Sequence, residues 1–347
     1  MDKDTVSLAI GERYVTIARL EAKGKLLFPS VMAIEAAPLN IYLDESAVGA
    51  ATMADFLHRL FRDAGVKATR ANLVIPDGRS YVRILEMPKL TEKELASAIR
   101  FQADQFIPIP IESVSLDLEI LQENPKDKKL AILLAATATR TVDKISHIIE
   151  KTGLIPEALE IESSAMMRLI GSQTDKFTGG QKAGLLVFIN FGASTTSIIV
   201  YDPLRQVPVD IISLSIGYDL FFMDLKNNIT EDEKAIEKLL IEVGFSAARA
   251  AHDIGPIINS PYLELEKEVS QFLAASKEKT KQSLAAIYLT GEGIGLKGLD
   301  KKLSVSLGLP VNIFNPASLL VANNVVEFFK SSLPLFSSVI GACLRSQ

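Results

Sequence analysis

The sequence predicts an α/β protein made of two similar halves. Each half begins with a strand, a glycine turn and a second strand: apolar residues alternate on either side of Gly11 in Thr5–Leu20, and Leu185–Tyr201 repeats this layout around Gly192. Glycine at the same place in both turns indicates a backbone conformation that other residues avoid. Between the halves, Gly171–Lys182 is polar and aperiodic, which is typical of a linker. Two unrelated hairpins would show the same pattern, so the hairpins alone leave duplication open.

The first half, residues 1–182, contains a block at about 81–153 that has the pattern of a small α+β unit. A helix is predicted over Thr91–Phe106, because a capping box begins it and Pro108 and Pro110 stop it. The rest of the block is predicted as two strands and a helix, at Val114–Leu121, Leu130–Ala136 and Thr141–Lys151. We expect this block to be an inserted subdomain.

The second half, residues 183–347, is expected to carry a helical insert at about 226–285, followed by a strand at Ala286–Thr290. This strand runs into the turn Gly291-Glu292-Gly293, and a helix is predicted at Leu299–Leu307. Such a junction lets the backbone approach a ligand and points a helix N-terminus at it. A plain strand–helix turn has the same sequence pattern.

The composition limits the classes of function. Of 347 residues, 48% are hydrophobic and 23% are charged, which is enough to bury a sizeable core. The formal charge of −5 argues against general nucleic-acid binding, which needs a basic face. The longest apolar stretch, Gly184–Val200, is too short and too polar for a membrane span, and the first residues lack a signal-peptide pattern. Any membrane role is therefore expected to go through a partner, without direct insertion.

Metal and disulfide chemistry are not indicated. His58, His147 and His252 have no neighbours at metal-ligand spacing, so no metal site is predicted. Cys343 is the only cysteine, so it forms no internal disulfide, which fits a reducing compartment.

Together, the three glycine turns resemble the two phosphate turns and the adenosine turn of the actin-like ATPases. The segment Asn190–Thr196 is similar to that superfamily's Asp-x-Gly-Ala-Ser-Thr-Thr element. Within it, the chain resembles the PilM family of cytoplasmic type IV pilus assembly proteins, and more distantly the division protein FtsA. The segments similar to PilM are Leu85–Leu95, Phe101–Asp117, Gly308–Val311, Asn315–Pro316 and Gly341–Arg345, and the resemblance covers almost the whole chain. It implies a duplicated actin-like, ribonuclease H-like ATPase fold in two halves.

The resemblance also implies a partner. A protein of this family would be a cytoplasmic scaffold of a type IV pilus or a related secretion system, held at the inner membrane by the N-terminal tail of a PilN-like bitopic protein. The block at about 81–153 would help to form the docking groove. Candidate groove residues are Phe106, Ile107, Ile109 and Ile111, four large apolar side chains beside two prolines that fix the backbone. Burial in the core would explain the same residues.

A nucleotide site is implied as well. By resemblance its residues are Gly11, Asn190, Gly192, Ala193, Ser194, Thr195, Glu237, Gly291 and Gly293, with ATP and Mg²⁺ as ligands. The chain departs from the pattern where catalysis needs it most. The two acidic positions of the family are Ala9 and Asn190 here, and Mg²⁺ prefers charged oxygen ligands. No residue is therefore assigned a catalytic role, and no cofactor is certain.

Further departures concern the space for a nucleotide. Glu12, Arg13 and Tyr14 are bulky where phosphates would approach, although Glu12 could replace the missing aspartate from the other side of the turn. Leu240 stands where the family has a lysine, and Glu292 stands between the two glycines of the last turn. We therefore expect a degenerate nucleotide site.

Two other functions remain open. The chain could be an ATP-binding switch or a weak ATPase, with nucleotide controlling the opening of the two halves. It could also be a division-type protein that polymerises, since the sequence leaves self-association open. Nucleotide bound to the purified protein would favour the first alternative, and filaments would favour the second.

Overall fold

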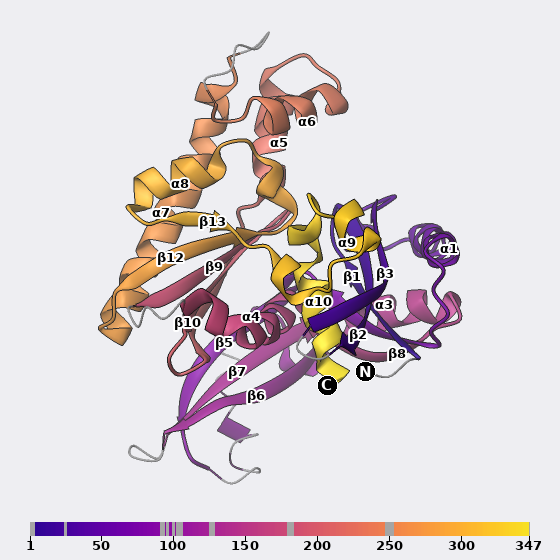
Figure 1. The fold of residues 1–347 in the computed structure, drawn as a ribbon, viewed down its shortest axis with the longest axis horizontal. Helices are drawn as coiled ribbons and strands as arrows, with labels where there is room; N and C mark the ends of the chain where they lie inside the picture. Colours follow the sequence, from indigo (N-terminus) through magenta and orange to yellow (C-terminus); the bar gives the residue numbers. More distant parts are fainter. Residues whose placement is uncertain are drawn as a thin grey trace. The chain divides into compact units, whose positions relative to one another are not determined.

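The computed structural model describes residues 4–23, 26–90, 94, 97–98, 101, 107–124, 129–178, 184–246 and 253–346. The chain divides into two compact units (Figure 1). The first consists of Met1–Ser172 and Ser338–Gln347, and the second of Gln173–Ser337. These units are defined by compactness and not by the duplication. The predicted boundary between the duplicated halves, at 182–183, therefore stays a prediction.

The first unit is built on a five-stranded sheet with the order β3-β2-β1-β4-β8. Its strands are β1 (Thr5–Ile10), β2 (Tyr14–Lys23), β3 (Leu26–Ala36), β4 (Arg70–Ile75) and β8 (Ile155–Ile161). The first three strands are antiparallel, whereas β1, β4 and β8 are parallel. Every residue of β1 is buried, as expected for the central strand of a covered sheet.

The second unit repeats this sheet, with the order β11-β10-β9-β12-β13. Its strands are β9 (Leu185–Phe191), β10 (Thr196–Asp202), β11 (Val207–Leu214), β12 (Leu284–Thr290) and β13 (Val311–Ile313). Again the first three are antiparallel, and β9, β12 and β13 are parallel. Because order and direction agree strand by strand, the prediction of two similar halves, each opened by a hairpin, is confirmed.

A separate three-stranded antiparallel sheet, with the order β5-β7-β6, lies in the sequence between β4 and α3. Its strands are β5 (Ser80–Pro88), β6 (Val114–Asn124) and β7 (Lys129–Ala138). Of the helix predicted over Thr91–Phe106, residues 94, 97, 98 and 101 are helical, and the others lie outside the described residues. The extent of this block as an insertion stays a prediction.

Besides the helical residues 94, 97, 98 and 101, the described helices of the first unit are α1 (Ala47–Asp63), α3 (Thr139–Lys151), the first part of α4 (Glu162–Thr178), and α10 (Ser337–Cys343). Helix α1 begins at a clear cap, because the Ser46 side chain accepts a hydrogen bond from the Gly49 N–H. Short 3₁₀ turns precede β5 at η1 (Asp77–Arg79) and β6 at η2 (Ile111–Ser113), and a third, η6 (Leu344–Ser346), follows α10.

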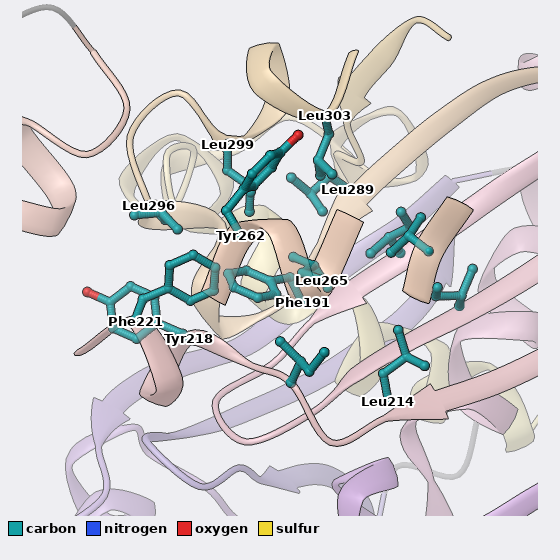
Figure 2. Close-up of a cluster of buried hydrophobic side chains, with 14 of the residues drawn as sticks. Phe191, Leu214, Tyr218, Phe221, Tyr262, Leu265, Leu289, Leu296, Leu299 and Leu303 are labelled. Carbon is teal, nitrogen blue, oxygen red and sulfur yellow. The ribbon is translucent and has the colours of Figure 1, made fainter. Parts of the chain in front are cut away.

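The second unit carries its helices between β11 and β12 and after β12. They are α5 (Tyr218–Asn228), α6 (Glu233–Glu242), α7 (Gly255–Thr280), α8 (Leu299–Leu307) and α9 (Asn324–Phe328), with 3₁₀ turns at η3 (Glu292–Gly295), η4 (Pro316–Leu319) and η5 (Leu333–Phe336). Figure 2 shows the core of this unit, where Phe191 and Leu289 of the sheet meet Phe221, Tyr262 and Leu299 of the helices. The predicted helix over 299–307 and the strand ending at Thr290 are confirmed.

The linker predicted over Gly171–Lys182 is wrong up to residue 178, because α4 continues to Thr178. The polar residues Gln173 and Thr174 are almost fully buried on that helix, and the Thr174 and Tyr201 hydroxyls lie 3.0 Å apart in a hydrogen bond. Polarity alone therefore led to the wrong prediction for a helix end that includes two buried polar side chains. Residues 179–182 lie outside the described residues.

No helix in the part of the chain that the structure describes is long and apolar enough to cross a membrane.

Cys343 is buried at the end of α10, where its Sγ lies 3.4 Å from the Ala18 carbonyl oxygen. Burial raises the pKa of the thiol to about 12. Because only the thiolate reacts, we expect native Cys343 to react with a disulfide reagent at mildly alkaline pH roughly a thousandfold more slowly than an ordinary thiol. Release of the coloured thiol measures this rate, and the urea-unfolded protein is the control. Equal rates in the two states would contradict the burial.

Candidate functional site

The end of β9 and the turn that leads to β10 hold five of the nine predicted nucleotide residues, Asn190 and Gly192–Thr195. The Gly192 N–H donates to the Thr195 carbonyl at 2.9 Å and closes the turn. Strand β12 runs parallel to β9 with Thr290 opposite Asn190, so Gly291 lies directly beside Asn190. Gly291 has a φ of +103°, and a Cβ there would lie 2.8 Å from the Phe191 carbonyl carbon, so only glycine fits.

The start of α5 closes the other side of this turn. The N–H groups of Tyr218 and Asp219 donate to the Gly192 and Ala193 carbonyls, at 3.0 and 2.8 Å. Gly217 permits this approach, since a Cβ there would lie 2.6 Å from the backbone N of Thr195. The structure thus brings the predicted residues at 190–195 and 291–293 together, and their role in nucleotide binding stays a prediction.

On α6, the predicted nucleotide residue Glu237 and the nearby Leu240 differ in burial. Glu237 is partly buried, and Leu240, three residues later, is fully buried in the apolar core. A lysine at position 240 would have to place its charge in that core, which is costly. Gly11, the remaining predicted residue, belongs to the first unit.

In the first hairpin turn, a glutamate forms an ion pair with an arginine from the turn η1. Its Gly11 N–H donates to the Tyr14 carbonyl at 2.9 Å, and the Glu12 carboxylate pairs with the Arg79 guanidinium. The Glu12 side chain is only 3% exposed, and Arg79 also stands 5.5 Å from the centre of the Tyr42 ring. Arg79 therefore compensates the charge of this buried carboxylate. Nothing in the sequence spacing pointed to Arg79 or Tyr42.

The first unit contains a cavity of about 540 Å³. Its walls come from β6 and β7 of the three-stranded sheet, from β8 of the five-stranded sheet, from α3 and α4, and from Arg345. Both β6 and β8 are edge strands of their sheets. Edge strands therefore form part of its walls, and among the described strands none pairs with the outer side of β6 or β8.

A charged cluster forms one wall of this cavity. The Glu160 carboxylate is 4% exposed and accepts two hydrogen bonds from Arg168, at 2.7 and 3.0 Å. Arg168 also donates to the Gly341 carbonyl at 3.0 Å, and Arg345 lies 3.5 Å from Glu160. These contacts join β8, α4 and the C-terminal helix around one buried carboxylate.

The described partner-site residues that the sequence predicted pack against the three-stranded sheet, away from the cavity lining. Ile107 is buried, and Ile109 and Ile111 are partly buried, against an apolar cluster of Met87, Leu130, Ile132, Leu134 and Ala136. These isoleucines are not among the residues that line the cavity, and Phe106 lies outside the described residues. Their role in partner binding stays a prediction.

The cavity was not predicted from the sequence. Its signal is the alternation along β6, where Ser115, Asp117 and Glu119 alternate with Leu116 and Leu118. Among the described residues, no group of three or more histidine, cysteine, aspartate or glutamate side chains is placed to hold a metal ion.

Comparison with known proteins identifies strong similarities. Residues 7–347 match the family model described as type IV pilus assembly protein PilM. Among solved structures, a "PilM-PilN type IV pilus biogenesis complex" is 20% identical with a TM-score of 0.84, covering 99% of this chain and 98% of that chain. The ethanolamine utilization protein EutJ from Carboxydothermus hydrogenoformans is 13% identical with a TM-score of 0.53, covering 98% of this chain and 88% of that chain.

Proposed function

Because the chain belongs to the PilM family of type IV pilus assembly proteins and has the actin-like ATPase fold, we propose that it is an assembly scaffold that binds the N-terminal tail of a PilN-like protein. The partner would be a bitopic inner-membrane protein, and the scaffold would be cytoplasmic and peripheral at that membrane. The observation that carries this proposal is the cavity of the first unit, with its two strand edges.

The cavity suits an extended peptide. A volume of about 540 Å³ is within the range of roughly 300–1,000 Å³ typical of ligand sites. Five consecutive residues of β6, Ser115–Glu119, line it, and they span roughly 13 Å at the usual rise of a strand. An extended tail can pair its backbone with such an edge and place alternate side chains in the cavity.

The segment predicted from the sequence precedes β6 in the chain, because Ile109 comes before the turn η2 (Ile111–Ser113), which leads into β6 at Val114. Ile109 and Ile111 pack against the apolar cluster that contains Ile132 and Leu134, whereas Ala135 and Thr137 of the same strand line the cavity. Because successive residues of a strand point to opposite faces, this segment would be a separate place for the tail, on the other face of the three-stranded sheet.

Filling the cavity is expected to abolish most tail binding. Ala135 on β7 lines the cavity, so Ala135→Trp would occupy the space of the peptide. We expect its affinity for a fluorescent peptide of the partner's tail, measured by anisotropy, to fall at least about tenfold, as for losing a hot-spot contact. Ala131→Trp is the control, because Ala131 is also partly buried on β7 but does not line the cavity.

Two outcomes would contradict the proposal. The tail peptide could fail to bind the unmodified protein, which would remove the function itself. Ala135→Trp could bind as well as Ala131→Trp, which would place the site elsewhere. An Ile109→Glu variant would then show whether the segment before β6 holds the tail instead.

We also propose that the nucleotide site is degenerate. The support is the loss of both acidic positions, at Ala9 and Asn190, together with the pairing of Glu12 with Arg79. Phosphoryl transfer needs the charge of a well-held Mg²⁺.

The expected ATPase activity is correspondingly low. Typical enzymes turn over on the order of 10 times per second, and we expect phosphate release below about a hundredth of that rate. A coupled phosphate assay measures it, and Thr195→Ala should change nothing. A faster rate that Thr195→Ala removes would contradict degeneracy.

A nucleotide-binding switch is the second candidate. The observation that favours it is the preserved geometry of the turn at 192–195, which is still held against α5 and Gly291. Binding of ATP without turnover, measured by calorimetry, would support this role beside that of the scaffold.

A further inference from the structure

We infer that the cavity of the first unit accepts a basic extended segment, whose cationic side chains at alternate positions lie against Asp117 and Glu119. This inference rests on the proposed function and specifies the chemistry of its partner. Both residues line the cavity from β6, and both are exposed.

Within the part of the chain that the structure describes, these two carboxylates differ from the third carboxylate of the cavity, which has arginine partners. Glu160 is held by Arg168 and by Arg345. Among the described residues, neither Asp117 nor Glu119 forms an ion pair, and the hydrogen bond described for Asp117 comes from the N–H of its neighbour, Leu118, at 2.9 Å. The described lining of the cavity thus has three carboxylates and two guanidinium groups, and within it the carboxylates that form no ion pair lie along β6.

The geometry of β6 places the two carboxylates on the same face of the strand. Side chains two residues apart on a strand point to the same face, so Asp117 and Glu119 stand side by side on β6. A strand added at this edge would place every second side chain on that face, directly opposite them. Opposite charges at such positions attract, and like charges repel, so an acidic tail would be rejected.

A peptide is the occupant that fits these observations. The two carboxylates lie along an edge strand and do not surround a single small ligand. An edge strand can pair with the backbone of an extended peptide. Charge complementarity at an exposed rim mainly accelerates association and gives selectivity. Affinity should therefore depend on salt and on the sequence of the tail.

The test uses the intact protein and two synthetic peptides. One peptide has the sequence of the partner's cytoplasmic tail, and the other has its lysines and arginines replaced by glutamine. The protein variant is Asp117→Asn/Glu119→Gln. The matched control, Glu112→Gln/Glu123→Gln, removes the same charge at exposed positions that do not line the cavity. Binding is measured by anisotropy at low and at high salt.

We expect the Asp117→Asn/Glu119→Gln protein to bind the tail roughly three- to tenfold more weakly at low salt, as for two exposed ion pairs. High salt should remove the difference, and the control should bind like the unmodified protein. The neutralised peptide should not distinguish the variant from the unmodified protein. If the tail binds the unmodified protein and the variant equally tightly, or if the tail carries no basic residue, the inference fails while the proposed function stands. If the tail does not bind the unmodified protein, the proposed function itself fails.

Discussion

Replacing Arg168 by alanine is expected to lower the free energy of unfolding of the first unit by about 3 kcal/mol. The substitution removes the two hydrogen bonds that hold the Glu160 carboxylate, whose side chain is 4% exposed. Loss of one partner of a buried ion pair typically costs about 3–5 kcal/mol, because the other charge stays buried without compensation. We expect the lower end of that range, because Arg345 still lies 3.5 Å from Glu160.

Urea unfolding followed by circular dichroism measures this loss. Arg70→Ala is the matched control, since Arg70 and its partner Glu157 are 50% and 40% exposed and such pairs contribute less than about 1 kcal/mol. The double substitution Arg168→Met/Glu160→Gln should be less destabilising than Arg168→Ala, because it leaves no uncompensated charge. If Arg168→Ala costs no more than Arg70→Ala, the buried pair does not stabilise the unit.

Replacing Gly341 by alanine is expected to destabilise the first unit by about 1–3 kcal/mol, the usual cost of overpacking. A Cβ at Gly341 would lie 2.6 Å from the carbonyl carbon of Ala165, so α10 would have to move away from α4. In an open helix the same substitution stabilises by up to about 1 kcal/mol, so the sign of the effect tests the contact.

Gly255→Ala is the control for this prediction. Gly255 begins α7, and a Cβ there would contact only the flexible Asp253 side chain, at 3.3 Å. Thermal unfolding should show a lower midpoint for Gly341→Ala and an unchanged or higher one for Gly255→Ala. A raised midpoint in both would mean that α10 does not pack closely on α4.

The parts of the fold that the sequence predicted are those fixed by local patterns. Alternating apolar residues around Gly11 and Gly192 were enough to predict both hairpins, and Leu299–Leu307 was predicted with its observed bounds. The glycine turn at 291–293 was also predicted from a local pattern. The φ of +103° at Gly291 favours glycine, so this backbone conformation is indicated by the residue type itself.

The parts that escaped prediction depend on residues far apart in the chain. The cavity is assembled from β6, β8, α4 and Arg345, and no spacing rule connects Asp117 with Arg345. The Glu12–Arg79 pair likewise joins two turns that only the sheet brings together. The predicted linker failed because buried Gln173 looks like any exposed polar residue.

The return of the last residues to the first unit has a consequence for fragments of this protein. Ser338–Gln347 belong to the first unit, although the whole second unit precedes them in the chain. A gene fragment that stops near residue 172 would therefore lack α10, the Gly341 carbonyl that Arg168 binds, and one wall of the cavity. Expressing the first unit by itself calls for a circular permutation or a fusion that restores this segment. Truncations from the C-terminus accordingly damage the N-terminal unit first.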